Sequence, residues 1–115
     1  MKHKFVKESL DSDKILYELL DPIFLESVAN ILTIGAKKYP YGKDPLYNWK
    51  NADLEDLHHY EGAIFRHFQE YRKGNVLDDE TSEPHLAHIV CSCMFLEYFR
   101  RVYGWTTKET EKTFT

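Results

Sequence analysis

The sequence predicts an all-α protein: a three-helix core, arranged as a hairpin or small bundle, with an irregular N-terminal arm. Three observations support this prediction. Asp21-Pro22 opens a stretch in which apolar residues recur at helical spacing, and a second stretch with the same period runs between Asp53 and Gly74. Pro84 opens a third stretch that is apolar almost all round, which is typical of a buried helix.

The residue pattern of the N-terminal third of the chain predicts an arm followed by the first helix. Residues 1–20 mix charges with a short apolar cluster, and we expect an extended or one-turn segment that lies across the body. Asp21 is suited to cap a helix, and proline fits its first position. Pro40 disfavours helical geometry in the residue before it, so this helix should end near Tyr39. Its apolar face comprises Phe24, Leu25, Val28, Ile31, Leu32, Gly35 and Tyr39.

Residues 40–50 are rich in turn formers and predict a loop, yet they carry Tyr41, Tyr47 and Trp49. Aromatic side chains on a loop either hold it against the core or stack on a ligand such as a nucleobase. Asn48 can both donate and accept hydrogen bonds, so its amide could read the edge of a base.

The second helix should run from about residue 53 to residue 71 or 73, and the third from Pro84 to about residue 102. Gly74 and Gly104 are placed to end them. A bundle of only three helices of this length cannot bury its third helix on all sides, although that helix is apolar all round. We therefore expect a homodimer or a larger homo-oligomer, in which two subunits could share a site.

The composition bounds the class of protein. A chain of 115 residues with 43% hydrophobic residues is enough for one domain, divided here into the arm (1–20), the helical core (21–104) and a flexible tail (105–115). A net charge of −4 without a basic stripe argues against binding a nucleic acid polymer. The basic N-terminus is followed by no apolar run, and no segment has the length of a membrane span. Cys91 and Cys93 read as small core residues, so we expect a cytoplasmic protein that contacts no membrane.

Imidazole and carboxylate side chains gather where the second helix ends and the third begins. The pattern is His67-x-x-Glu70, an acidic connection with Asp78 and Asp79, and then His85-x-x-His88. Because the connection is short, the two helices should be antiparallel neighbours, which brings these groups together. On spacing alone, partly buried core histidines explain the pattern equally well. The functional reading is a divalent metal site, with Mg²⁺ favoured by oxygen ligands and Mn²⁺, Co²⁺, Ni²⁺ or Zn²⁺ by imidazoles.

Four segments resemble a known family. They are residues 32–39 (LTIGAKKY), Asn48-Trp49, Arg66-His67 and residues 85–88 (HLAH), and their order and spacing also match. Together they are similar to the phage-type dATP/dGTP diphosphohydrolase (pyrophosphohydrolase) domain, related to the all-α MazG-like nucleotide pyrophosphatases. The resemblance implies hydrolysis of dATP or dGTP to the monophosphate and pyrophosphate, in the host cytoplasm if the chain is phage-encoded.

The resemblance also implies roles for individual residues. The wider superfamily holds Mg²⁺ with a Glu-x-x-Glu pair and a Glu-x-x-Asp pair, whereas imidazole replaces three of those four carboxylates in this chain. The implied metal ligands are His67, Glu70, Asp78, His85 and His88. The implied catalytic residues are Glu70, Asp78 and His88. The implied contacts to the purine nucleotide are Lys38, Tyr39, Asn48, Trp49 and Arg66.

Three alternatives remain open from the sequence. The first is a nucleotide-binding protein on the same fold that does not cleave its ligand. The second is a metal phosphohydrolase of the His-Asp type, which is disfavoured because the chain has no adjacent His-Asp dipeptide. The third is a structural helical module whose histidines belong to the core.

Overall fold

The computed structural model describes residues 13–39 and 44–108, and it confirms the all-α fold with a three-helix core. The helices are α2 (Pro22–Lys38), α3 (Leu54–Arg72) and α4 (His85–Tyr103). Two short 3-10 helices, η1 (Tyr17–Leu19) and η2 (Pro45–Asn51), precede and follow α2. The aromatic residue Tyr41 and the end of the predicted tail lie outside the described residues. None of the described helices is both long and apolar enough to cross a bilayer.

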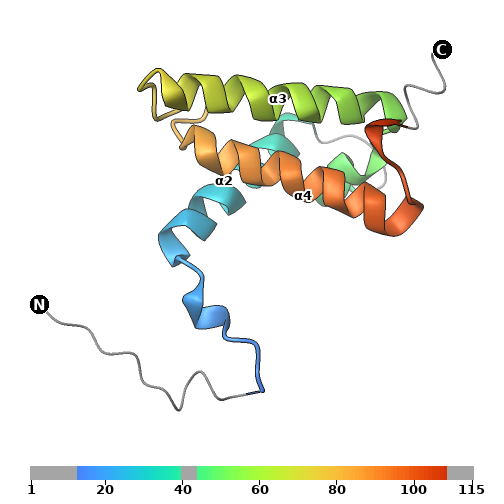
Figure 1. The fold of residues 1–115 in the computed structure, drawn as a ribbon, viewed down its shortest axis with the longest axis horizontal. Helices are drawn as coiled ribbons and strands as arrows, with labels where there is room; N and C mark the ends of the chain where they lie inside the picture. Colours follow the sequence, from blue (N-terminus) through green and yellow to red (C-terminus); the bar gives the residue numbers. More distant parts are fainter. Residues whose placement is uncertain (1–12, 40–43, 109–115) are drawn as a thin grey trace, which may run out of the picture.

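Helices α3 and α4 form the predicted hairpin and lie side by side, and α2 packs against α4 (Figure 1). The centre of the core is made by Leu57 from α3 and by Ala87, Cys91 and Phe99 from α4, all of which are buried. Because α4 faces both other helices, it supplies most of these buried side chains. The site described below lies at the end of the hairpin where α3 passes into α4.

Local sequence signals fix the helix ends. Asp53 caps α3 in a capping box, in which its side chain accepts from the backbone N–H of Asp56 while the Asp56 side chain accepts from the backbone N–H of Asp53. Gly74 and Gly104 follow α3 and α4 with φ angles of 94° and 71°, a left-handed conformation that glycine adopts without strain. Helix α4 begins one residue after Pro84, which occupies the cap position.

Two predictions about packing are wrong for a single chain. The described part of the arm includes the expected single helical turn, but it extends away from α3 and α4 instead of crossing them (Figure 1), and Ile15 is 74% exposed. Helix α4 is also not buried all round, because Val90 and Met94 remain 41% and 37% exposed. Two neighbouring helices can cover only part of the circumference of a third. The expectation of a homo-oligomer rests on this uncovered surface and stays a prediction.

Candidate metal and nucleotide site

The connection between α3 and α4 is a tight turn that holds Asp78 beside the two helix ends. An isolated β-bridge pairs Leu77 with Pro84, and the backbone N–H of Asp78 donates to the carbonyl of Glu83 at 2.8 Å. The N–H of Ser82 donates back to the carbonyl of Asp78, also at 2.8 Å, with Ser82 at a φ of 60°. These backbone bonds close the turn and direct the Asp78 side chain toward the histidines.

The Asp78 carboxylate organises this turn. Its Oδ2 atom accepts three hydrogen bonds: from the backbone N–H of Glu80 at 3.1 Å, from the backbone N–H of Thr81 at 3.0 Å and from the Thr81 hydroxyl at 3.2 Å. Burial opposes ionisation of Asp78, but the hydrogen bonds from Thr81 and the nearby His88 outweigh it, so the pKa of the carboxyl is lowered. Asp78 is therefore an anion at neutral pH.

Three imidazoles meet beside this anion. The Nδ1 atoms of His67 and His85 lie 2.7 Å apart, so one ring donates to the other. The rings of His67 and His88 are stacked, with centroids 4.4 Å apart and an angle of 11° between planes. Burial, reinforced by the neighbouring histidines, lowers the pKa of His67. Burial also lowers the pKa of His88, although the charge of Asp78 opposes the shift. At neutral pH both rings are therefore uncharged and can act as ligands or bases.

Thr81 links Asp78 to His88. Its hydroxyl oxygen lies 3.2 Å from Oδ2 of Asp78 and 2.8 Å from Nε2 of His88. The hydroxyl has one proton, so its direction sets the tautomer of His88. With that proton directed at Asp78, Nε2 of neutral His88 carries a hydrogen that it donates to Thr81, and the lone pair is on Nδ1. With the proton directed at Nε2, Nδ1 carries the hydrogen instead.

His67, Asp78 and His85 form a possible divalent metal site. One ligand atom from each lies within 4.8 Å of the other two, a spacing that a single ion could bridge after small side-chain movements. Two imidazole nitrogens and one carboxylate oxygen suit Mn²⁺, Co²⁺, Ni²⁺ or Zn²⁺ better than Mg²⁺, which prefers oxygen. The residues present therefore fit the group that the sequence predicts.

Two other predicted ligands lie beside this trio. His88 stacks on His67 and reaches Asp78, with Nε2 3.7 Å from Oδ2. The Glu70 carboxylate accepts from Asn75 at 2.7 Å and from Lys73 at 3.1 Å. These two partners lower the pKa of Glu70. Glu70 shares a small pocket with the trio, but its oxygens are engaged by residues at the end of α3.

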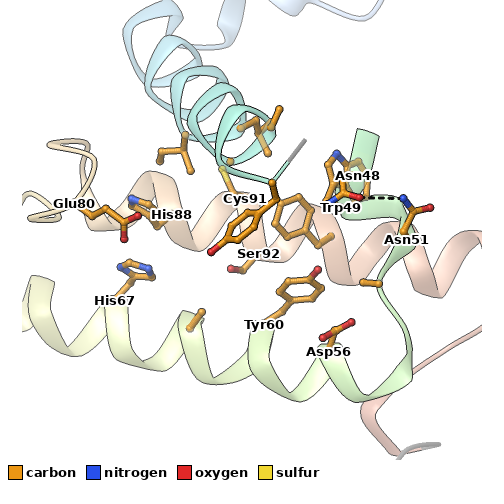
Figure 2. Close-up of a pocket in the computed structure, with 18 of the residues that line it drawn as sticks. Asn48, Trp49, Asn51, Asp56, Tyr60, His67, Glu80, His88, Cys91 and Ser92 are labelled. Atoms are coloured by element: carbon orange, nitrogen blue, oxygen red, sulfur yellow. Dashed lines mark hydrogen bonds between the residues drawn. The ribbon is translucent and has the colours of Figure 1, made fainter. Parts of the chain in front are cut away.

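A cavity of about 830 Å³ opens next to the histidines and extends between α2, η2, α3 and α4 (Figure 2). Its size is in the range of small-molecule sites in proteins. His67, His88 and Glu80 lie at one end, and Asn48, Trp49 and Asn51 from η2 lie at the other (Figure 2). Arg66 also lines the cavity, with its guanidinium beside Gly62, one turn earlier on α3 than its own backbone. The apolar residues that line the cavity include Ile31, Leu32, Ala36, Ala63 and Phe95.

Four of the five predicted nucleotide contacts line this cavity: Tyr39, Asn48, Trp49 and Arg66. The fifth, Lys38, is not among the lining residues but pairs with Glu80, which is, at 2.5 Å. Trp49 also packs on α4, with its ring centroid 4.9 Å from those of Phe95 and Tyr98. Trp49 thus holds η2 against the core, as the first interpretation of the aromatic loop predicts, and it also forms part of the cavity wall. Its stacking on a nucleobase stays a prediction.

Sequence reasoning missed several polar residues of the cavity. Glu80 was hidden within an acidic turn, and Asp56 and Tyr60 within the first two turns of α3. Thr81, which contacts Asp78 and His88 beside the cavity, was hidden in the same turn as Glu80. In the sequence, Asp56 is recognisable only as the residue that completes the capping box with Asp53. That pattern explains where α3 begins and suggests nothing about a ligand. Helical periodicity alone does not tell which of these side chains face a cavity.

Comparisons with known proteins agree with this picture. The family model described as dATP/dGTP diphosphohydrolase, N-terminal, matches residues 6–109. A protein of Salmonella phage PMBT28 named dATP/dGTP diphosphohydrolase is 38% identical over 86 residues, which are 75% of this chain and 27% of the phage protein. The chain thus spans about a quarter of the length of this curated relative. No solved structure matches.

Proposed function

The chain belongs to the dATP/dGTP diphosphohydrolase N-terminal family, and we propose that it is a metal-dependent pyrophosphohydrolase for purine deoxynucleoside triphosphates. It would release the monophosphate and pyrophosphate from dATP or dGTP. The name of the phage relative gives the reaction class, and the geometry supports its placement in this chain. We further propose that the protein acts in the cytoplasm as a homodimer or larger homo-oligomer of the MazG-like type.

One observation carries the proposal: the imidazole and carboxylate donors adjoin a nucleotide-sized cavity, whose wall includes His67 and His88 while Asp78 and His85 line the neighbouring pocket. His67 belongs both to the possible metal trio and to the cavity wall. A divalent ion held by His67, Asp78 and His85 would supply positive charge beside the phosphates and make a water molecule more acidic. The triphosphate would then lie at the histidine end of the cavity and the base at the end formed by η2.

Arg66 is the main cationic side chain offered to the phosphates. It is the only Arg or Lys among the residues that line the cavity in the described part of the chain. Its planar guanidinium can bind two phosphate oxygens at once and neutralise charge that builds on the leaving pyrophosphate. Lys38 would contribute only after separating from Glu80, an exposed pair that water screens.

We assign proton transfer to His88. In the tautomer in which the Thr81 proton is directed at Asp78, Nε2–H of His88 donates to Thr81, and the lone pair on Nδ1 accepts a proton from the attacking water. Asp78 orients this relay through the Thr81 hydroxyl and stabilises the imidazolium that forms. Glu70, whose carboxylate is occupied by Lys73 and Asn75, is the alternative base that the family resemblance implies.

A second candidate is a nucleotide-binding module that does not cleave its ligand. It is favoured by the donor set, because the trio contains a single carboxylate where the superfamily uses four. Such a module would bind the nucleotide in the same cavity without releasing pyrophosphate.

Product analysis distinguishes these functions. Purified protein is incubated with dATP, dGTP, dCTP or dTTP and with Mg²⁺, Mn²⁺, Co²⁺, Ni²⁺ or Zn²⁺, and pyrophosphate and monophosphate are quantified. The enzyme proposal expects both products, in equal amounts, from the purine nucleotides with at least one metal. Binding of a purine nucleotide without either product would support the second candidate.

Variants test the assigned residues. His85→Ala and His88→Gln should each reduce turnover at least about tenfold, as expected for losing a ligand or a general base. Glu70→Gln should reduce turnover by a similar factor only if Glu70 is the base. His59→Gln, an exposed histidine on α3, is the matched control. Unchanged turnover in both His85→Ala and His88→Gln would refute the site.

Thr81 is tested by a matched pair of variants. Thr81→Val should lower turnover and alter its pH profile, whereas Thr81→Ser should keep the wild-type turnover and pH profile.

A further inference from the structure

The end of the cavity remote from the histidines carries one carboxylate that the proposed reaction does not use. Asp56, in the first turn of α3, lines the cavity together with Tyr60, Asn51 and Asn48 (Figure 2). The only other carboxylate among the described lining residues is Glu80, which is paired with Lys38. Asp56 is thus the acidic group that remains to meet a ligand.

The helix cap uses only part of the Asp56 carboxylate. Its Oδ2 atom accepts from the backbone N–H of Asp53 at 2.9 Å, and among the described residues Oδ1 has no hydrogen-bond partner. The cap also fixes the side chain, because the capping box holds it in one orientation at the start of α3. A fixed carboxylate with a free acceptor oxygen is preorganised to receive hydrogen-bond donors from a ligand.

Electrostatics decides which part of a nucleotide can face Asp56. His67 lies eleven residues later on the same helix, about 16 Å at 1.5 Å per residue. That separation is comparable to the length of an extended purine nucleoside triphosphate. A carboxylate repels phosphate oxygens, so the phosphates belong at the His67 end, where Lys38 offsets the charge of Glu80, and the base at the Asp56 end. Trp49 and Tyr60 supply aromatic surface near this end.

We propose that Asp56 is a specificity-determining residue that makes this site prefer guanine to adenine. The inference rests on the proposed function, because it assumes that the cavity binds a purine deoxynucleotide. Guanine presents two adjacent donors, N1–H and the exocyclic N2 amino group, which a carboxylate can accept together. Adenine presents the N6 amino donor beside N1, an acceptor, so its edge leaves a lone pair facing the carboxylate.

The neighbouring amides complete the recognition of the base. The Asn51 side chain donates to the Oδ1 atom of Asn48 at 3.2 Å, which orients both amides at the cavity end. The unused donor of Asn48 can then reach an acceptor such as guanine O6, while Asp56 accepts from N1–H and N2. Each polar group on this edge of guanine, namely O6, N1–H and the N2 amino group, would then face a protein group of the opposite hydrogen-bonding kind.

Binding measurements with uncleavable nucleotides test this preference separately from turnover. Dissociation constants are measured by calorimetry for the α,β-methylene analogues of dGTP, dITP and dATP, with the metal that best supports turnover or, if none does, Mn²⁺. The wild-type protein should bind the dGTP analogue at least about tenfold more tightly than the dATP analogue, as one charge-assisted hydrogen bond implies. The dITP analogue, which lacks the N2 amino group, should lie between them.

Asp56→Asn is the decisive variant. Its amide oxygen can still accept from Asp53 and keep the cap, while its amino group opposes guanine N1–H and complements adenine N1. The variant should bind the dGTP analogue about tenfold more weakly and the dATP analogue equally or more tightly. Glu55→Gln removes a charge from the same turn at an exposed position and should leave the preference unchanged. Thermal unfolding of each variant checks that the fold is kept.

The possible results separate the two proposals. Equal binding of the two purines by the wild type, tighter binding of the adenine analogue, or an unchanged ratio in a folded Asp56→Asn protein would each overturn the role of Asp56. The proposed function would survive all three. If the wild type binds no purine analogue with any metal, the proposed function fails, and the inference falls with it.

Discussion

Replacing Asp78 tests whether one carboxylate both shapes the α3–α4 turn and completes the metal site. Asp78→Ala removes the acceptor of three hydrogen bonds and leaves the partly buried Thr81 donors unpaired. Leaving such donors unpaired costs about 2 kcal/mol. In a domain of this size that corresponds to a melting temperature lower by about 8 °C. Asp78→Asn keeps one oxygen facing the same donors, so it should lose about half as much.

The assay is thermal unfolding of the three proteins, with and without divalent metal. A ligand present at 100 times its dissociation constant stabilises the folded state by about 2.7 kcal/mol, so wild-type protein should gain about 10 °C with its metal. Asp78→Asn should keep most of the metal-free stability but lose most of this gain. The reasoning would be refuted if Asp78→Asn retained the full metal-induced shift, or if Asp78→Ala melted at the wild-type temperature without metal.

Three further predictions follow from other residues. Cys91 is buried as predicted, but Cys93 is exposed and is not the core residue that the sequence predicted. Alkylation should therefore modify Cys93 well before Cys91, because burial raises the pKa of the Cys91 thiol to about 11; equal rates would contradict the α4 packing. Burial, with Asp56 and Asp53 nearby, raises the pKa of Tyr60 from 10.0 to about 12, so its contribution to stability is complete below pH 10 and is lost as the pH rises toward 12. Chemical denaturation across that range should show this loss in the wild type and a smaller one in Tyr60→Phe. Gly62→Ala should add up to about 1 kcal/mol of helix stability, but its Cβ would lie 2.8 Å from the Arg66 guanidinium and displace it. Calorimetry should then show weaker nucleotide binding, and unchanged affinity would argue against a phosphate role for Arg66.

The convergence of the candidate site was predictable because it depends on local rules. A capped helix, a short acidic connection and a second helix form a hairpin whose ends must meet. His67, Asp78 and His85 occupy that end at positions set by helical spacing, and the structure brings them together. Their hydrogen-bond partners were not predictable. Glu70 turns to Lys73 and Asn75, and Thr81 takes its place beside Asp78, because the turn geometry determines which donors reach each carboxylate.

The sequence by itself determined the helices, the side-chain caps of α2 and α3, and the gathering of imidazole and carboxylate groups, since each depends on residues close together in the chain. The tertiary structure alone decided the cavity and its polar ends. Lys38 pairs with Glu80 across 42 positions, and Trp49 from η2 packs on Phe95 of α4, contacts that depend on how α2 and η2 dock. The role proposed for Asp56 likewise depends on the tertiary structure. Helical periodicity assigns a side chain to one face of its helix, but the packing of the helices decides whether that face meets the core, solvent or a cavity.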